Sequence, residues 1–199
     1  DAQLTRAAAA WQLQLDSDLL AGEIRLPDDS GATLVANLSR LQLPARQPTD
    51  PSAPPAADPL ASVDPRQIPA LDLTIAKVLQ GDKLVGAMAL KARPTPAGVS
   101  FSDLNIDLKG LLVTGGLVWD GAPGASRSRY TGRLKGKDLA AVLTAWQFAP
   151  SVTSESFRVD VEGNWQGSPL NFNMQHLTGK VDLRLNRGQF LEVSGGSAA

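Results

Sequence analysis

Acid–base or metal chemistry in this chain would have to come from its carboxylates and its one histidine. The 199 residues include His176 but no other histidine and no cysteine, so neither a histidine pair nor a thiolate set is available to hold a metal ion. We interpret the isolated histidine as a polar residue at the end of a hairpin. We therefore predict no metal site, no bound cofactor and no disulfide.

Several acidic residues lie close together in the sequence, but their pattern does not favour catalysis. Each alternates with apolar residues, which places it on the polar face of a strand together with Lys109, Arg158 and Arg184. Cross-strand ion pairs explain such a face, whereas general acid–base catalysis needs carboxylates that converge in a partly dry cleft. The sequence thus predicts that the chain is not an enzyme. The acidic residues are Asp103, Asp107, Asp160, Glu162 and Asp182.

The elements that position these side chains are predicted to be β-strands. Alternation with a period of two is clearest in residues 157–177, on either side of the break Gly167-Ser168-Pro169. Such alternation is typical of strands with one dry and one polar face, and a short break between two of them predicts a β-hairpin. The apolar rows of the two expected strands are Phe157, Val159, Val161, Gly163 and Trp165, and then Leu170, Phe172 and Met174.

A second pair of strands occurs twice in the sequence. Residues 84–108 repeat the pattern of residues 20–43 at an offset of about 64 residues, and each copy changes phase in its second strand. One extra residue, near Ser39-Arg40 and again near Ser102-Asp103, would restore the phase in the way that a β-bulge does. The repetition favours an extended array of hairpins over a compact site.

Residues 44–69 interrupt the strand pattern. Eight of the 14 prolines fall in this segment, which has no hydrophobic periodicity. We expect an exposed, mostly disordered loop or an extended polyproline-type connector. It would separate a hairpin-repeat segment, residues 1–43, from a longer β-segment, residues 70–199. A proline-rich ligand for a partner domain is the functional alternative.

One short helix is predicted, from Asp138 to Phe148. Asp138 is suited to the N-cap, and Pro150 limits how far the helix can continue. We interpret its apolar stripe as a structural plug against the sheet. The stripe consists of Leu139, Val142, Leu143 and Trp146, at helical spacing.

The chain is therefore expected to be mainly β, a long, curled antiparallel sheet of about twelve strands with one short helix. At about 4.8 Å per strand such a sheet is roughly 58 Å wide, whereas a helix of about 11 residues is only about 16 Å long. Most of the dry face would thus need another cover. The sheet could close into a sandwich or barrel, be covered by other parts of a longer protein, or form an open trough completed by a ligand with long hydrocarbon chains.

Composition restricts the partners further. A net charge of −1 does not favour a nucleic-acid partner. No run of 18 apolar residues is present, so no transmembrane helix is predicted. The chain does not begin with Met, and its last strand pattern, residues 189–193, ends abruptly. We expect an internal segment of a longer protein whose targeting signals lie elsewhere.

Several motifs within residues 64–193 resemble the C-terminal part of the YhdP-type branch of the AsmA-like family. The most specific are WQGSP at residues 165–169, LTGKV at residues 177–181 and RGQFLEV at residues 187–193. The proline-rich segment departs from the family's pattern. The resemblance implies a large Gram-negative envelope protein, anchored in the inner membrane, whose periplasmic body carries phospholipids towards the outer membrane through an apolar β-groove.

On this interpretation the chain is one periplasmic segment of the groove. Its partners would be phospholipid acyl chains and, through other parts of the protein, the inner and outer membranes. A closed β-sandwich acting as a structural or adhesin-like interaction module is the alternative. The residues expected to line the groove are Leu84, Met88, Leu90, Val99, Phe101, Ile106, Leu108, Val113, Leu117, Trp119, Leu134, Phe157, Val159, Val161, Leu170, Phe172, Met174, Val181, Leu183 and Leu185.

Overall fold

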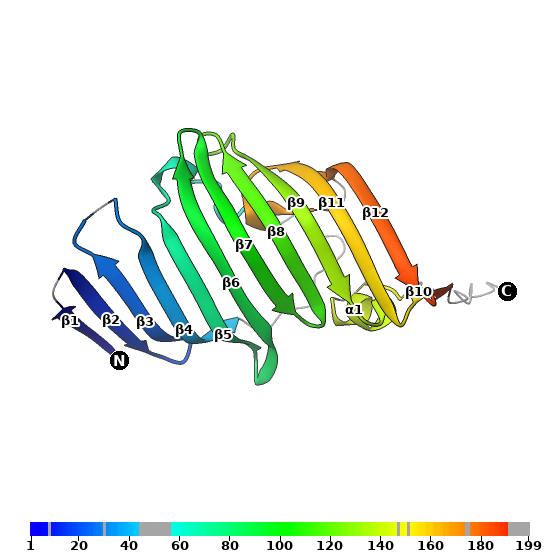
Figure 1. Ribbon diagram of the computed structural model, residues 1–199, viewed down its shortest axis with the longest axis horizontal. Helices are drawn as coiled ribbons and strands as arrows, with labels where there is room; N and C mark the ends of the chain where they lie inside the picture. Colours follow the sequence, from blue (N-terminus) through cyan, green and yellow to red (C-terminus); the bar gives the residue numbers. More distant parts are fainter. Residues whose placement is uncertain are drawn as a thin grey trace.

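The main feature of the fold is one open sheet of eleven strands, accompanied by a separate two-stranded pair (Figure 1). The computed structural model describes residues 1–7, 9–29, 31–43, 57–146, 148–150, 152–173 and 176–190. The prediction of a long sheet with one short helix is confirmed. The strands of the large sheet, in spatial order, are β1 (Ala2–Ala7), β2 (Ala10–Asp16), β3 (Leu20–Pro27), β4 (Leu34–Leu43), β5 (Leu71–Gln80), β6 (Lys83–Thr95), β7 (Gly98–Leu108), β8 (Leu111–Asp120), β9 (Arg127–Gly136), β11 (Ser156–Gln166) and β12 (Thr178–Asn186).

The expected antiparallel order has one exception, because β4 and β5 are parallel. A parallel pair needs a crossover that returns the chain to the starting end of the strand. Residues 44–70 provide it, and the described part includes the 3-10 helix η1 (Pro65–Gln67), capped by Asp64. The expected disorder therefore does not hold for residues 57–69. Residues 44–56 lie outside the described part of the chain.

The predicted hairpin at residues 157–177 is only half right. Its first strand is β11, but residues 169–171 form the 3-10 helix η2 (Pro169–Asn171), and the strand that pairs with β11 begins at Thr178. The local sequence favours this turn, because the Ser168 hydroxyl accepts a hydrogen bond from the Leu170 amide and Pro169 stands at the start of the turn. Leu170 and Phe172 thus belong to a connection between strands.

Both bulges of the predicted repeat are present. The pairing of β3 with β4 skips Ser39, and the pairing of β6 with β7 is interrupted between Ser102 and Asn105. Asp103, inside the second bulge, has a φ of 52°, which is the left-handed conformation that an extra strand residue often adopts. The two copies of the repeat therefore share a hairpin with a bulge in its second strand.

The predicted helix is α1 (Leu139–Ala145), which is shorter than expected. Asp138 caps it as predicted, since its carboxylate accepts a hydrogen bond of 3.0 Å from the Ala140 amide. The helix packs mainly against β10 (Val152–Thr153), which pairs with β13 (Gln189–Phe190). It therefore sits at the lower ends of the long strands (Figure 1).

The ends of the strands form two long edges of the sheet, which we call the upper and lower rims as they stand in Figure 1. The upper rim carries the β6–β7 turn and the β11–β12 connection, and the lower rim carries the β7–β8 turn and α1. Because adjacent residues of a strand point to opposite faces, each long strand contributes to an apolar face and to a polar outer face.

Candidate functional site

The candidate site is the apolar face of the large sheet, and its centre is a row of register partners that crosses ten strands. Partners in a ladder point to the same face, so their side chains form a continuous strip perpendicular to the strands. We call this strip the central row. From β12 to β2 it consists of Leu183, Val159, Leu134, Val113, Ile106, Met88, Ile75, Leu38, Gly22 and Leu15.

Burial varies along the central row. Leu183, on the outermost strand β12, is 51% exposed, whereas Ile75 and Leu38 are 4% and 8% exposed. The members on β6 to β11 are only partly buried. The strip is thus packed by its neighbours near β4 and β5 and is open to solvent towards β12, so an apolar ligand could contact it there without displacing protein side chains.

The upper rim is partly closed by residues 57–69, which we call the strap. Its apolar side chains Leu60, Val63 and Ile68 pack on a buried cluster of Ala92, Val99 and Trp119. These cluster residues belong to the ends of β6, β7 and β8. The strap therefore covers the upper end of the apolar face at β6, β7 and β8.

A polar contact fixes the strap to the β11–β12 connection. The Asp58 carboxylate accepts hydrogen bonds from the Ser168 amide at 2.8 Å and from its hydroxyl at 2.6 Å. The carbonyl oxygen of Ser168 in turn accepts a hydrogen bond of 2.9 Å from Nε1 of the buried Trp165. Although burial raises the pKa of Asp58, the hydrogen bonds from Ser168 and from the Leu60 amide together hold that pKa below its usual value.

The lower rim is bounded by α1 and the β7–β8 turn. Val142 is buried, and the Lys109 ammonium lies 5.4 Å from the centre of the Trp146 ring, a cation–π distance. Phe157, at the start of β11, is 5% exposed and lies beside Gly136 of β9. Within the described residues, the strap thus covers the upper end of the apolar face and α1 bounds its lower end, while the central row between them is only partly buried on β6 to β11.

Sixteen of the twenty residues predicted to line a groove lie on this face. Register pairing and packing bring them together across β6 to β12. They are Met88, Leu90, Val99, Phe101, Ile106, Leu108, Val113, Leu117, Trp119, Leu134, Phe157, Val159, Val161, Val181, Leu183 and Leu185. Of these, Val99, Trp119 and Phe157 are buried and do not reach the open middle.

The other four predicted residues are placed differently. Leu84 is 63% exposed, and its neighbour Val85 contacts the buried cluster around Leu38 instead. Leu170 is 67% exposed, and Phe172, 50% exposed, stacks edge-on against Trp165 at 5.3 Å. Both lie in the β11–β12 connection. Met174 lies outside the described residues.

Sequence reasoning missed two groups of apolar residues. The first is the continuation of the face onto β2–β5, where Leu13, Ile24 and Leu73 alternate with polar residues in the same way as the residues that were included. The second is the apolar side of the strap, which was not recognised because its prolines predict disorder. The signal that was available is the presence of Leu60, Val63 and Ile68 in the second half of the proline-rich segment, whose first half has no large apolar residue.

The outer face carries the charged residues, as predicted from their phase. Asp160 accepts a hydrogen bond of 2.8 Å from Arg133 on β9 and another of 2.8 Å from Arg158. Lys91 and Asp103 form a second cross-strand pair at 2.7 Å. The hydrogen bonds from Arg158 and Arg133 lower the pKa of Asp160 to about 2. Cross-strand ion pairing thus accounts for these carboxylates.

Neither a metal-ligand cluster nor a membrane-spanning helix is found among the described residues. There, no three His, Cys, Asp or Glu side chains come together as ligands for a metal ion. Nor does any described helix have the length and apolar character needed to cross a membrane.

Comparison with known proteins gives one family and one curated relative. The sequence matches the family described as YhdP protein over residues 1–199. Over 109 residues it is 26% identical to a protein of Escherichia coli (strain K12) named "Intermembrane phospholipid transporter YhdP". That match covers 49% of this chain but only 9% of the relative. No solved structure matches the chain significantly.

Proposed function

Because the chain belongs to the YhdP protein family, we propose that its sheet is one segment of a conduit for phospholipids. The acyl chains would lie against the central row, and the polar headgroups would remain in water above the open side of the trough. The observation that carries this proposal is the middle of the apolar face, which the described residues leave partly exposed on β6 to β11 and largely exposed on β12. Contiguous apolar surface of this kind marks a binding surface.

Energetics favour acyl chains as the occupant. Each buried CH₂ group contributes about 0.8 kcal/mol, so even a part of one fatty acyl chain gains several kcal/mol on the strip. The central row presents only aliphatic side chains, methionine and glycine. The central row offers no directional polar contact. An acyl chain is therefore bound equally well at successive positions along the row, and it can slide from one to the next.

The conduit as a whole would extend beyond this segment. The relative named as an intermembrane phospholipid transporter is far longer than the matched region. We therefore propose that further hairpins continue the trough on both sides, that the body lies in the periplasm, and that other parts of the protein reach the inner and outer membranes. The edge of β12, where Val181 and Leu183 are 54% and 51% exposed, is one place where the apolar face could continue.

Site-specific photocrosslinking in cells tests the proposal. A photoreactive residue at Val161, on the apolar face of β11, should form adducts with phospholipids. The same residue at Glu162, its exposed neighbour on the polar face, serves as the matched control. We expect adducts at position 161 and few at position 162, because only the former lies on the apolar face.

Two outcomes count against the proposal. Equal yields at the two positions would show non-specific contact with membranes. No adduct at position 161, in a variant that is folded and as abundant as the original protein, would show that lipids do not occupy the face. Mass spectrometry of the released adducts would identify the lipid class.

A further inference from the structure

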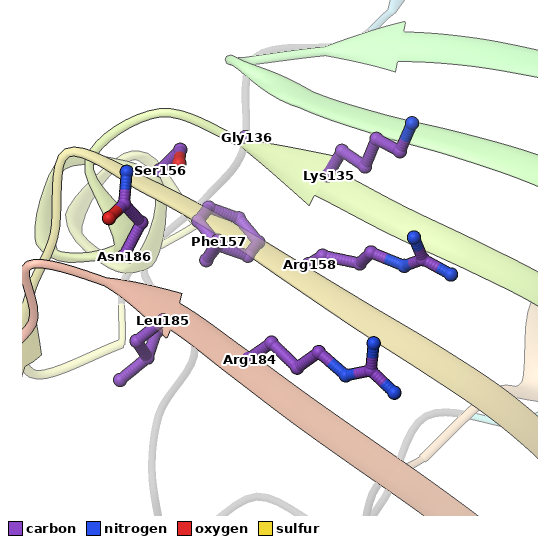
Figure 2. Close-up of a pocket in the computed structure, with 8 residues that line it drawn as sticks. All are labelled: Lys135, Gly136, Ser156, Phe157, Arg158, Arg184, Leu185 and Asn186. Atoms are coloured by element: carbon purple, nitrogen blue, oxygen red, sulfur yellow. The ribbon is translucent and has the colours of Figure 1, made fainter.

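Three cations lie side by side on the outer face of the sheet, at its lower rim. Lys135 of β9, Arg158 of β11 and Arg184 of β12 are direct register partners, and their side chains point the same way (Figure 2). We call these three residues the cationic row. Like charges directly opposite each other destabilise a sheet, so the fold itself gains nothing from this row. An acidic partner bound there would relieve the repulsion.

Nearby carboxylates do not neutralise the cationic row. Asp160 is shared between Arg158 and Arg133, at 2.8 Å from each. Asp182 lies 3.5 Å from Arg184. The row and Arg133 together make four cations against two carboxylates, which leaves a local charge of +2 on a chain whose net charge is −1. The outer face is thus locally basic at the lower rim.

Two members of the row are accessible to a partner. Lys135 and Arg184 are exposed, and Lys135 forms no ion pair within the described residues. Glu155, an acidic residue at the same rim, is paired with Arg187 at 2.7 Å, so these two add no net charge. The ammonium of Lys135 and the outer edge of the Arg184 guanidinium are therefore free to contact a carboxylate.

A hollow of about 390 Å³ adjoins the cationic row. Its lining includes the hydroxyl of Ser156 and the amide of Asn186, which stand beside Arg158 and Arg184 (Figure 2). Both groups can donate hydrogen bonds to a carboxylate. The surface therefore offers room and additional donors for an acidic side chain, beyond the charge of the row itself.

The row has a defined end on β8. Leu112 is the register partner of Lys135, and Asp107 of β7 is in turn the partner of Leu112. A partner that crosses the strands from β12 to β7 would meet three cations, then one apolar side chain, then a carboxylate. Acidic groups of the partner are therefore favoured only over β9 to β12.

We infer that the cationic row binds an α-helix of a partner protein that presents three carboxylates on one face. Neighbouring strands are about 4.8 Å apart, so the row is roughly 10 Å long. Helix residues i, i+4 and i+7 lie on one side of a helix and span about 10.5 Å along its axis. A helix that lies across the strands can thus place one Asp or Glu against each cation, and a guanidinium matches a carboxylate with two donors.

A protein helix fits this surface better than a nucleic acid or a membrane does. On the outer face of β9, β11 and β12, whose residues are all described, the strand phase places no aromatic or large apolar side chain. Single-stranded nucleic acids are bound by stacking on aromatic rings, and interfacial segments insert apolar side chains into the bilayer.

The inference goes beyond the proposed function and does not depend on it. The cationic row lies on the outer face, whereas the acyl chains are proposed to lie on the opposite, apolar face. A partner helix and a lipid could therefore be bound at the same time. Because the cations are exposed, binding should be weak and reversible and should fall as salt rises.

Fluorescence anisotropy with the full-length protein tests the inference. The probe is a labelled helical peptide of about 20 residues, built from Ala and Gln, with Glu at positions i, i+4 and i+7. A control peptide has the same composition with Glu at i, i+5 and i+10, on different sides of the helix. The test variant is Lys135→Gln/Arg184→Gln, which leaves both arginines on Asp160. The matched control variant, Arg127→Gln/Lys180→Gln, removes two exposed cations near the upper ends of the same strands.

We expect saturable binding of the probe at low salt, weakened about fivefold in the test variant and unchanged in the control variant. The control peptide should bind the original protein more weakly than the probe. Equal binding of the probe by the original protein and the test variant, or no binding at all, would overturn the site. Equal binding of the two peptides would show a response to net charge alone and overturn the helix. If phosphatidylglycerol vesicles displaced the probe, the row would be a membrane contact and not a protein site.

Discussion

Ser168 is a small residue on which the closure of the upper rim depends. Its side chain is fully buried, and its hydroxyl donates to the Asp58 carboxylate at 2.6 Å. Its carbonyl accepts from Trp165, which packs in the cluster with Leu104 and Tyr130. One residue thus joins the strap, the end of β11 and the apolar cluster beneath them.

We predict that Ser168→Ala destabilises the protein by about 1–3 kcal/mol, because the Asp58 carboxylate loses one donor and stays in place. Urea unfolding would measure the change. Tryptic cleavage after Arg66 in the strap should also become faster, because the strap loses part of its attachment. Ser102→Ala, on the exposed outer face of β7, is the control and should change stability by less than about 0.5 kcal/mol. Equal stability and equal cleavage for the two variants would show that this contact does not hold the strap.

The contact between Asp58 and Ser168 also shows a limit of reading single residues from sequence. The motif WQGSP at residues 165–169 is recognisable as a turn, because glycine, serine and proline have local conformational preferences. Its partner lies 110 residues earlier, within a segment whose prolines predict disorder. No local pattern connects the two, so the prediction could not extend to the tertiary contact.

At the scale of elements, the strands were predictable because the two faces of this sheet differ in polarity throughout. The bulges at Ser39 and Asp103 were also predictable, since each reverses the phase of the alternation. Strand direction was not predictable, because the alternation of apolar and polar residues is the same in either direction. The parallel pairing of β4 with β5 was therefore not predicted. The prediction of a second strand in residues 157–177 was wrong for another reason. Leu170 and Phe172 alternate with polar residues, but they lie in a connection that contains a 3-10 turn.

One glycine of the repeat has a role that the alternation concealed. Gly86 alternates in sequence with the apolar residues Leu84 and Met88, but its φ is 148°, a conformation that L-residues rarely adopt. Gly22, at the matching position of the first copy, has a φ of 143°. A Cβ on Gly86 would overlap the backbone carbonyl of Asp107 on β7. Both hairpins thus use glycine to let two strands approach closely, which allows the sheet to bend.

We predict that Gly86→Ala destabilises the protein by about 3 kcal/mol or more, since it combines backbone strain with overlap against a strand that is held on both sides. Gly116→Ala is the matched control. A Cβ there would lie 3.4 Å from the carbonyl oxygen of Phe101, and its strand, β8, is also internal to the sheet. Thermal unfolding would compare the two. A loss of stability no larger at position 86 than at position 116 would refute the role assigned to Gly86.

At the scale of the whole molecule, the sheet is open and its apolar strip runs across the strands. A strip in that direction lengthens with each hairpin added, whereas the strap and α1 cover only the two rims. The alternative of a closed sandwich required Met88 and Val159 to face each other from opposing sheets. They lie instead in one row of one sheet, separated by β7, β8 and β9.

This arrangement makes the function sensitive to a single charge on the strip. Leu183→Asp would place a carboxylate among apolar side chains at the β12 end of the central row, where an acyl chain would have to displace the water around it. Because Leu183 is 51% exposed, the variant should still fold. We predict that transfer of phospholipid by the full-length protein, measured between donor and acceptor vesicles, falls by about tenfold or more.

Asn105→Asp is the matched control, because it adds the same charge to the exposed polar face of β7. It should transfer lipid at the original rate, and the melting temperatures of both variants should stay within a few degrees of the original. If Leu183→Asp folded and transferred lipid at the original rate, lipids would have to pass without contacting the central row at β12. If both variants slowed transfer equally, the effect would come from net charge, and the central row would not be the path.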